Sequence, residues 1–358
     1  MAQIRLMSWN IEVYGPNKYG NVPNRMNLVR FIARAVQQQN ANLLVIQELM
    51  TSVAHQICFS VAQQLGTYTG HAWQYRDVVT RVAGDRESYG VFWRTDRNFG
   101  ITQDGNAAEN LVLSDNQFPN GFSPWNGRRP VIGVFRTTDT ATNFAISSYH
   151  APPRGNQAAQ GVEPLATTTM LYSVDRNNHN ENVDGRILAG DYNLGVTDDE
   201  FDWLTDPLPA LPPPNAAGEG AGTTPIVPTD GNGPDYTHYA RRGGAVRVWG
   251  PNMANWSANP VLYRDYQLDN SYYATPAMIP GAAGGVVDLV AEIMLPASPL
   301  RQIAQTFALT DGHGNRAFPL ADTIPAPLNV NLSTAPCAWL LYRYGVSDHL
   351  PVLNVVTI

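Results

Sequence analysis

Apolar segments that end in a short polar signature recur from one end of this sequence to the other. An apolar segment of strand length that ends in polar side chains indicates a buried strand whose carboxyl end reaches the rim of a sheet. Five such signatures occur: Ser8-Trp9-Asn10-Ile11, Ile46-Gln47-Glu48-Leu49, Ser148-Tyr149-His150-Ala151-Pro152, Gly190-Asp191-Tyr192-Asn193-Leu194 and Ser347-Asp348-His349-Leu350-Pro351. We expect a fold that gathers these strand ends at one shared rim.

The first two signatures belong to a strand–helix–strand unit. Ile4–Val13 is apolar until its polar end, Asn24 can cap a following helix with an apolar face, and Asn42–Leu49 is a second apolar segment. A right-handed crossover makes two such strands parallel, with their carboxyl ends on the same side of the sheet. Asn10 and Glu48 should therefore be near neighbours.

The remaining pattern is rich in strands. Two further segments have helical character, Val53–Leu65 and Ala158–Asn177. Strands are expected at Trp73–Val79, Ser88–Arg94, Val131–Arg136, Asn143–His150 and Arg186–Ala189. Many strands and few helices favour sheets packed on sheets, with helices outside. Because the signatures span the sequence, we expect a single catalytic domain over residues 1–358, with an insertion rich in Pro and Gly around 205–235.

The residue types in the signatures agree in their chemistry. A hard divalent cation such as Mg²⁺ prefers carboxylate and amide oxygens, whereas a thiol or multi-histidine cage would indicate zinc. The oxygen donors available are Asn10, Glu48, Asp191, Asn193 and Asp348. Hydrolysis of a phosphoric ester also needs a base for water and groups that stabilise charge on the phosphoryl oxygens, which His150 and His349 can supply.

The ordered signatures resemble the motifs of the endonuclease/exonuclease/phosphatase superfamily, which includes pancreatic-type deoxyribonuclease. The resemblance rests on Trp-Asn-Ile, Gln-Glu-Leu, Tyr-His-Ala-Pro, Gly-Asp-Tyr-Asn and Ser-Asp-His-Leu-Pro-Val, and it extends from Ser8 to Val352. It implies an α/β fold in the form of a four-layered sandwich, with two mixed β-sheets face to face and helices outside. It also implies Mg²⁺ as the cofactor, with Mn²⁺ as a substitute.

The resemblance assigns roles to the signature residues. Asn10 and Glu48 would bind the metal, with Asp348 close to it. Asp191 and Asn193 would position the attacking water and the phosphate. His150 would contact phosphate or act as the acid, and His349 would be the general base or a phosphate contact.

Further candidates come from weaker matches to the same family. Glu87-Ser88-Tyr89 is similar to its Glu-x-Tyr strand, in which Glu87 would orient His150 and Tyr89 would approach phosphate. Many deoxyribonuclease-like members carry a Tyr two residues earlier, where this sequence has Asp85. Either Asp269 or Asp288 could orient His349; we prefer Asp269, because polar Asn270 follows it and fits a strand end. His238 is a substrate-side candidate.

Charge bears on the choice of substrate. The formal net charge is −7 and Lys18 is the only lysine, so any affinity for nucleic acid must come from local arginine clusters. Such clusters occur at Arg76/Arg81/Arg86, Arg128/Arg129 and Arg241/Arg242/Arg247, with Arg129 as a candidate substrate contact. Nuclease activity on DNA or RNA is the first hypothesis. A hydrolase of small or lipid phosphate esters is the alternative, and an inactive binding or scaffold protein comes third.

Other features bound the setting of the protein. Cys58 and Cys337 lie far apart without zinc or redox spacing, so we expect two unpaired thiols that pack as small hydrophobes, although one disulfide in a secreted protein would also fit. No apolar stretch has the length of a membrane span, so we expect no stable membrane insertion. No signal peptide is seen; a complete chain would be cytoplasmic, and one that had lost its leader would be secreted.

Overall fold

The structure is a computed structural model. It describes residues 3–20, 22–80, 86–96, 100–101, 128–137, 143–152, 173–176, 179–182, 185–193, 224–225, 238–239, 264–266, 269–274, 279–280, 284–307, 332–333, 338–339, 341–342, 345–347 and 349–357. Of the insertion expected around 205–235, the structure describes 224–225, which form a short strand.

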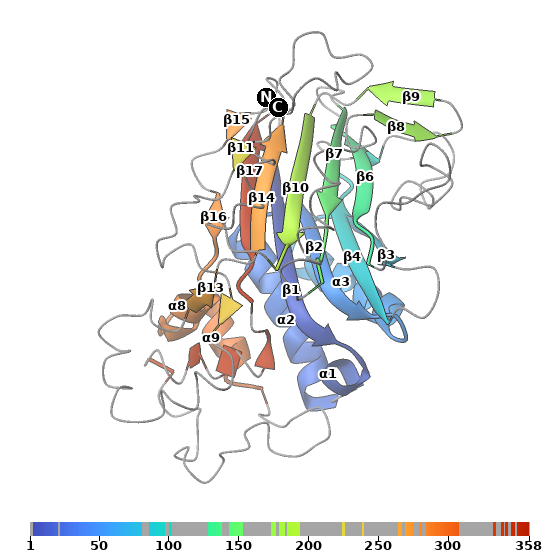
Figure 1. Cartoon of the computed structure of the whole chain (residues 1–358). Helices are drawn as coiled ribbons and strands as arrows, with labels where there is room; N and C mark the ends of the chain where they lie inside the picture. The colour runs from blue at the N-terminus through green and yellow to red at the C-terminus, as the bar shows by residue number, and fades with distance from the viewer. Residues whose placement is uncertain are drawn as a thin grey trace.

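The first sheet is built around the two N-terminal strands (Figure 1). Its order is β15 (Ile279–Pro280), β17 (Val352–Thr357), β1 (Gln3–Tyr14), β2 (Leu43–Met50), β4 (Glu87–Arg94) and β3 (Trp73–Val79), and β16 (Gly285–Val286) also pairs with β17. β1 and β2 are parallel, as the strand–helix–strand pattern predicted. The other pairs are antiparallel, and Gln3 lies opposite Thr357, which brings the two ends of the chain together.

The second sheet has a comparable centre. Its order is β11 (Thr224–Pro225), β14 (Asp269–Ala274), β10 (Gly185–Asp191), β7 (Asn143–Ser148), β6 (Val131–Arg136) and β5 (Gly100–Ile101). β7 and β10 are parallel, and their neighbours are antiparallel. Two short hairpins stand apart, β8 (Ser173–Arg176) with β9 (His179–Asn182) and β12 (His238–Tyr239) with β13 (Arg264–Tyr266).

The two sheets enclose an apolar interior. Alternate residues of β1, β2 and β4 pack against alternate residues of β6, β7 and β10, as the two-residue period of a strand requires. The fully buried members include Leu6, Val45, Val91, Phe135, Phe144 and Ile187. This packing makes the chain an α/β sandwich of two mixed sheets face to face, which confirms the expected fold class.

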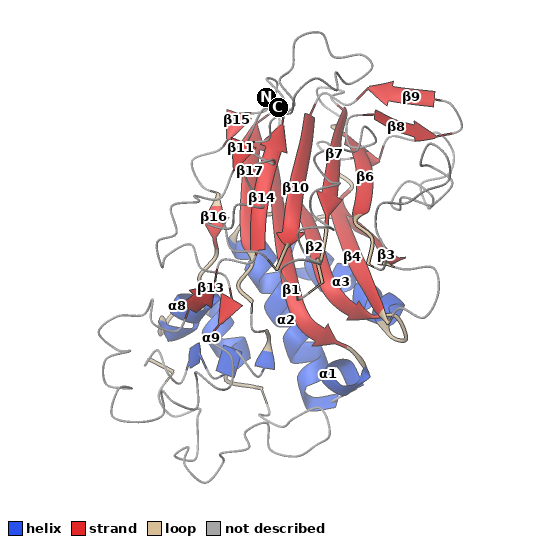
Figure 2. Cartoon of the chain, in the orientation of Figure 1, coloured by secondary structure: helices blue, strands red, loops and turns tan. Residues whose placement is uncertain are grey.

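The described helices cover the outer face of the first sheet (Figure 2). They are α1 (Pro16–Gly20), α2 (Val22–Gln38), α3 (Ala54–Thr69), α8 (Leu289–Met294) and α9 (Pro299–Ala304). Their buried side chains, such as Phe31 of α2 and Leu65 of α3, share one core with Trp9 of β1. Cys58 lies in this core as a free thiol, and Cys337 is outside the described residues. None of the helices in the described ranges is long and apolar enough to cross a bilayer.

Two local expectations were wrong. Within Ala158–Asn177, which was expected to be helical, the described residues Ser173–Arg176 form strand β8. Asn177 and Asn178 separate β8 from β9 in the sequence, and asparagine pairs favour tight hairpins, which outweighs a weak helical pattern. The helix α2 begins at Val22 and so includes Asn24, because a proline near the start of a helix, here Pro23, is well tolerated.

Candidate active site

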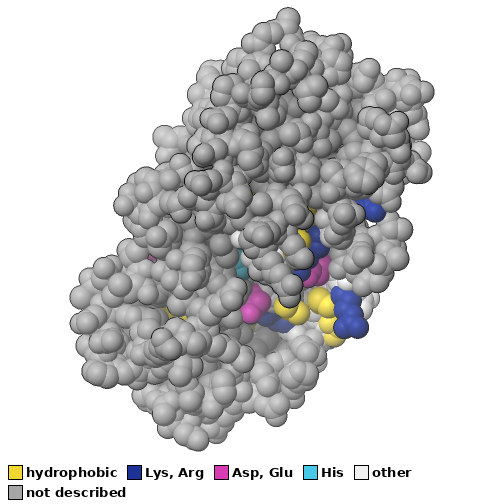
Figure 3. Space-filling model, viewed as in Figure 1, with side chains coloured by type: hydrophobic (Ala, Val, Ile, Leu, Met, Phe, Trp, Pro, Cys, Tyr) yellow, Lys and Arg dark blue, Asp and Glu magenta, His cyan; other side chains and the backbone are white. Residues whose placement is uncertain are grey.

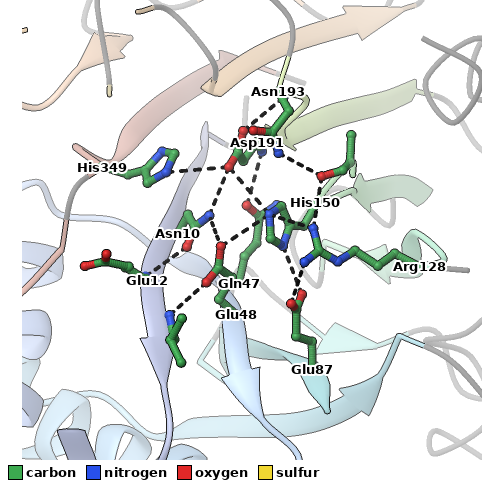
Figure 4. A network of polar contacts seen from close by, with 12 residues as sticks. Asn10, Glu12, Gln47, Glu48, Glu87, Arg128, His150, Asp191, Asn193 and His349 are labelled. Carbon is green, nitrogen blue, oxygen red and sulfur yellow. Dashed lines mark hydrogen bonds and ion pairs between the residues drawn. The ribbon is translucent and has the colours of Figure 1, made fainter. Parts of the chain in front are cut away.

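The carboxyl ends of the two parallel pairs meet at one rim of the sandwich. In Figure 3 acidic, histidine and basic side chains of the described residues come to the surface in one region of this face. Figure 4 shows the polar network of the site from close by. The site is therefore assembled from β1, β2, β7 and β10, the central strands of both sheets.

A bulge in β1 shapes the first part of the site. Asn10 pairs with Gln47 and Tyr14 pairs with Leu49, so the three residues Ile11–Val13 lie opposite the single residue Glu48. Bulges of this kind re-aim side chains at strand ends. Three of these residues have positive φ: Glu12 at 38°, Val13 at 48° and Glu48 at 60°. For a β-branched residue such as Val13 this conformation is costly, so the surrounding contacts must hold the bulge in place.

The bulge holds Asn10 and Glu48 through its backbone. The N–H of Glu12 donates to Asn10 Oδ1 at 2.9 Å, and the N–H of Val13 donates to Glu48 Oε2 at 2.8 Å. This fixes the amide of Asn10 so that its Nδ2 donates to Glu48 Oε1 and to Asp191 Oδ2, each at 3.0 Å. Asn10 thus lies between the two carboxylates and presents N–H groups to both.

Gln47 joins the two sheets beneath the site. Its Nε2 donates to Ser148 Oγ at 2.8 Å and to Tyr149 O at 3.1 Å, and its Oε1 accepts from the N–H of Asp191 at 3.1 Å. The approach is close, since a Cβ on Gly190 would lie 2.1 Å from Tyr149 O. Gln47 was not among the predicted site residues, although its place beside Glu48 at a strand end was a usable signal.

Asp191 is the point where both histidines converge. Its Oδ2 lies 3.7 Å from His150 Nε2 and 3.6 Å from His349 Nε2, and its carboxylate is almost fully buried. Its Oδ1 accepts from the N–H of Asn193 at 3.0 Å. The amide of Asn193 donates to Ala151 O at 2.7 Å, with φ of 51°. The structure therefore brings together Asn10, Glu48, His150, Asp191, Asn193 and His349.

Glu87 and Arg128 hold the far side of His150. Glu87 Oε2 lies 3.1 Å from His150 Nδ1, and Arg128 pairs with Glu87 Oε1. Burial by itself lowers the pKa of His150, but Glu48, Glu87 and Asp191 outweigh it, so that the pKa is raised and the cationic imidazole is favoured. Burial raises the pKa of Glu87, and His150 and Arg128 outweigh that effect and lower it.

The guanidinium of Arg128 lies beside His150, whereas the expected substrate contact was its neighbour Arg129. Its Nη1 lies 3.0 Å from His150 Nε2 and donates to Ala151 O at 3.1 Å. Arg129 contributes its carbonyl, which accepts from the hydroxyl of Tyr89 at 3.0 Å. The same hydroxyl accepts from the N–H of His150 at 3.0 Å, so Tyr89 is a buried brace behind the histidine.

The segment before β17 is tied to β1. Ser347 Oγ donates to Asn10 O at 2.6 Å and accepts from the N–H of His349 at 3.0 Å. The carbonyl of His349 accepts from Trp9 Nε1 at 3.2 Å and from Tyr342 OH at 2.6 Å. Although Asn10 and His349 are distant in sequence, these bonds place them in one site.

The remaining predicted residues lie in other strands, at the start of a helix, or outside the residues that the structure describes. Asp269 is paired with Asp191 across β14 and β10, so its backbone is at the site. Asp288 caps α8, where its side chain accepts from the N–H of Ala291 at 2.9 Å. His238 pairs with Tyr266 in the β12–β13 hairpin. Asp348 lies outside the described residues, as do Arg241, Arg242 and Arg247.

Among the described residues, one group of side chains could hold a metal ion. Glu48, His150 and Asp191 each offer a ligand atom, and these atoms all lie within 4.8 Å of one another. Two carboxylates suit a hard divalent cation such as Mg²⁺ or Mn²⁺, and the single imidazole offers a nitrogen of the kind that softer divalent metals prefer. The donor set therefore fits a divalent metal. In the orientation that the bulge imposes, Asn10 supports these carboxylates through N–H groups rather than offering its oxygen.

Comparison with known proteins identifies the fold. No family model and no curated protein matches the sequence. Among solved structures, an endonuclease/exonuclease/phosphatase from Bacteroides vulgatus aligns with a TM-score of 0.53 and 13% identity over 100% of both chains. A mannosyl-6-phosphatase from Bacteroides thetaiotaomicron aligns with a TM-score of 0.53 and 14% identity over 99% of this chain and 100% of its own.

A third solved structure extends the same likeness. ANGEL2, a 2′,3′-cyclic phosphatase, aligns with a TM-score of 0.50 and 11% identity over 99% of this chain and 95% of its own. At such identities the shared property is the arrangement of the backbone. The chain therefore has the fold of the endonuclease/exonuclease/phosphatase proteins, as the motifs predicted.

Proposed function

We propose that this protein is a divalent-metal-dependent phosphodiesterase, with nucleic acid as its first candidate substrate. The observation that carries the proposal is the convergence of Glu48, His150 and Asp191 within 4.8 Å, with His349 on another side of Asp191. Two carboxylates, two histidines and an arginine make up the groups that phosphoryl transfer requires. That a mannosyl-6-phosphatase and a 2′,3′-cyclic phosphatase share the fold supports phosphoric esters as the substrate class.

The metal would be Mg²⁺, with Mn²⁺ as a substitute. Glu48 and Asp191 would hold the ion, and Asn10 would keep the two carboxylates in position through its N–H groups. When bound, a divalent cation supplies Lewis-acid polarisation of a phosphoryl oxygen and neutralises charge there. Asp348 remains a further candidate ligand on the grounds of the motif.

The protein's own residues would manage the protons. Asp191 and Asn193 would orient the attacking water. His349, whose Nε2 lies 3.6 Å from Asp191 Oδ2, would take the proton of this water or contact the phosphate. His150, which Glu87 holds through Nδ1, would present Nε2 to a phosphoryl or leaving oxygen. Glu87 orients His150, as Tyr89 does from behind, and Arg128 adds positive charge on the substrate side.

A small or lipid phosphate ester is the second candidate substrate. The charge of Arg128 is partly neutralised by its ion pair with Glu87, and the whole chain carries a formal net charge of −7. Both features weaken the attraction for a polyanion and would matter less for a small ester. The scaffold hypothesis is the weakest, because a non-catalytic protein has no need for this pair of histidines on one buried carboxylate.

A substrate screen tests the proposal directly. Purified protein with Mg²⁺ or Mn²⁺ is assayed on plasmid DNA, single-stranded DNA, RNA, a bis-aryl phosphate, sphingomyelin and inositol phosphates. We expect hydrolysis of a phosphodiester that disappears on chelation and returns when Mg²⁺ or Mn²⁺ is added. Undiminished activity after exhaustive metal removal would refute the metal-dependent scheme, and turnover of monoesters alone would refute the diesterase assignment.

A further inference from the structure

Lys18 lies behind the bulge of β1, on the short helix α1 that follows it. Its ammonium donates to three backbone carbonyls, those of Ile11 at 2.8 Å, Glu12 at 2.7 Å and Val346 at 2.9 Å. An ammonium has three N–H donors and no acceptor, so three converging carbonyls satisfy it well. These three acceptors are backbone carbonyls from two segments that are far apart in the sequence.

Two of these carbonyls belong to the same peptide groups that hold the metal-site side chains. The Ile11–Glu12 peptide accepts from Lys18 with its C=O and donates to Asn10 Oδ1 with its N–H. The Glu12–Val13 peptide accepts from Lys18 with its C=O and donates to Glu48 Oε2 with its N–H. In a trans peptide the C=O and the N–H point in opposite directions. Lys18 therefore lies on one side of both peptides, and Asn10 and Glu48 lie on the other.

The third bond reaches the other end of the site. Val346 directly precedes Ser347, whose hydroxyl donates to Asn10 O and accepts from the N–H of His349. Lys18 thus connects the bulge that fixes Asn10 and Glu48 with the segment that presents His349. Glu12 and Val13 have positive φ values of 38° and 48°, and Lys18 bonds to both peptide groups that join Ile11, Glu12 and Val13.

We propose that Lys18 is a positioning residue of the active site. Its charge-assisted bonds stabilise the bulge, and hydrogen bonding at a carbonyl strengthens the N–H of the same peptide as a donor. Asn10 and Glu48 are thereby held in the geometry that the metal site needs, and His349 is held in register with them. The effect of Lys18 on the geometry of the bulge does not depend on what the protein does, whereas its effect on activity rests on the proposed function.

The test compares Lys18→Met with Arg25→Met. Methionine has nearly the length of lysine without its charge or donors. Arg25 also anchors α1, since its Nε donates to Tyr19 O at 2.7 Å and its guanidinium lies 4.6 Å from the Tyr19 ring centroid. Both of these contacts go to α1 rather than to the bulge. Loss of stability through α1 should therefore affect both variants, whereas loss of positioning should affect Lys18→Met alone.

Three measurements on the full chain read out the effect. Mn²⁺ affinity by calorimetry should fall about tenfold to a hundredfold in Lys18→Met, as expected when a group supporting a metal ligand is lost, and should be unchanged in Arg25→Met. The kcat on the substrate found in the screen should fall with little change in KM. Metal-free crystal structures should show the bonds from Glu12 to Asn10 and from Val13 to Glu48 broken in Lys18→Met and intact in Arg25→Met.

Metal-free structures keep this inference separable from the proposed function. If the wild type neither binds Mn²⁺ nor hydrolyses any ester, the proposed function fails, and the crystal structures still decide the role of Lys18. An unaltered bulge in Lys18→Met, or equal losses of Mn²⁺ affinity in the two variants, would overturn the positioning role. Should Lys18→Met fail to fold, Lys18→Gln, which retains N–H donors without the charge, is measured in the same way.

Discussion

Asp191 occupies the point where the two sheets contribute to the same chemistry. His150 follows β7 of the second sheet and His349 precedes β17 of the first, and both imidazoles approach Asp191 Oδ2, at 3.7 and 3.6 Å. Asn10 of the first sheet donates to the same oxygen at 3.0 Å. Burial of a carboxylate is costly unless polar partners compensate for the lost water, and both histidines and Asn10 lie close enough to Asp191 to do so.

Replacement of His349 or Asp191 should remove turnover. We expect His349→Ala and Asp191→Asn to lower kcat by about 10²- to 10⁴-fold, because each removes a group that handles a proton or orients water. Circular dichroism should show a retained fold. The matched control is His55→Ala, since the side chain of His55 is 69% exposed and pairs with Asp77 on the surface. Wild-type kcat in a clean preparation of His349→Ala would contradict the mechanism.

At the scale of elements, the site depends on how closely β7 and β10 approach β2. Gly190 of β10 directly precedes Asp191 and pairs with β14. A Cβ added to Gly190 would meet Tyr149 O and Gln47 Nε2. A side chain there would separate Gln47 from Tyr149 and the N–H of Asp191. Glycine is therefore needed at this position of the Gly-Asp motif because no side chain fits between the strands, and not because the backbone requires a positive φ.

Gly190→Ala should destabilise the protein and impair the site. The added Cβ would lie 2.1 Å from Tyr149 O, a backbone atom that cannot simply rotate away, so the free energy of unfolding should fall by about 3 kcal/mol. Denaturant unfolding measures this. Gly66→Ala is the control, because a Cβ there would lie 3.5 Å from His71 O, in ordinary contact, within helix α3. The control should be neutral or more stable by up to about 1 kcal/mol.

At the scale of the whole molecule, charge separates the two candidate substrates. The formal net charge is −7, and the cation seen beside His150 is Arg128, which is paired with Glu87. Binding of a polyanion would have to overcome the net charge through local contacts, and it would release counterions as it did so. A small ester would release few.

Salt dependence should therefore identify the substrate class. If nucleic acid is the substrate, KM for DNA or RNA should rise steeply between roughly 50 and 200 mM salt, whereas KM for a bis-aryl phosphate should change little. Steady-state kinetics on both substrates in the same buffers measures this, with the aryl ester as internal control. Equally shallow slopes would argue for the small-ester alternative.

Much of the fold followed from local pattern. Ile4–Val13 and Asn42–Leu49 are apolar segments joined through a helix, and β1 and β2 are parallel as that pattern requires. The strands at Trp73–Val79 and Val131–Arg136 have the expected bounds. The helix expected within Ala158–Asn177 was wrong at Ser173–Arg176, where hairpin formation with β9 outweighed local propensity. Pairing with a partner strand is a tertiary contact that helical periodicity does not record.

The polar side chains at strand ends could be predicted along the chain, because burial of apolar strands imposes a readable pattern. How those side chains are held became visible in three dimensions: the bulge opposite Glu48, the bridge made by Gln47, the guanidinium of Arg128 rather than Arg129 at His150, and the position of Lys18 behind the bulge. Each of these depends on backbone groups from elements far apart in sequence. These backbone groups come together only when the sheets pack, and a local sequence pattern does not describe that packing.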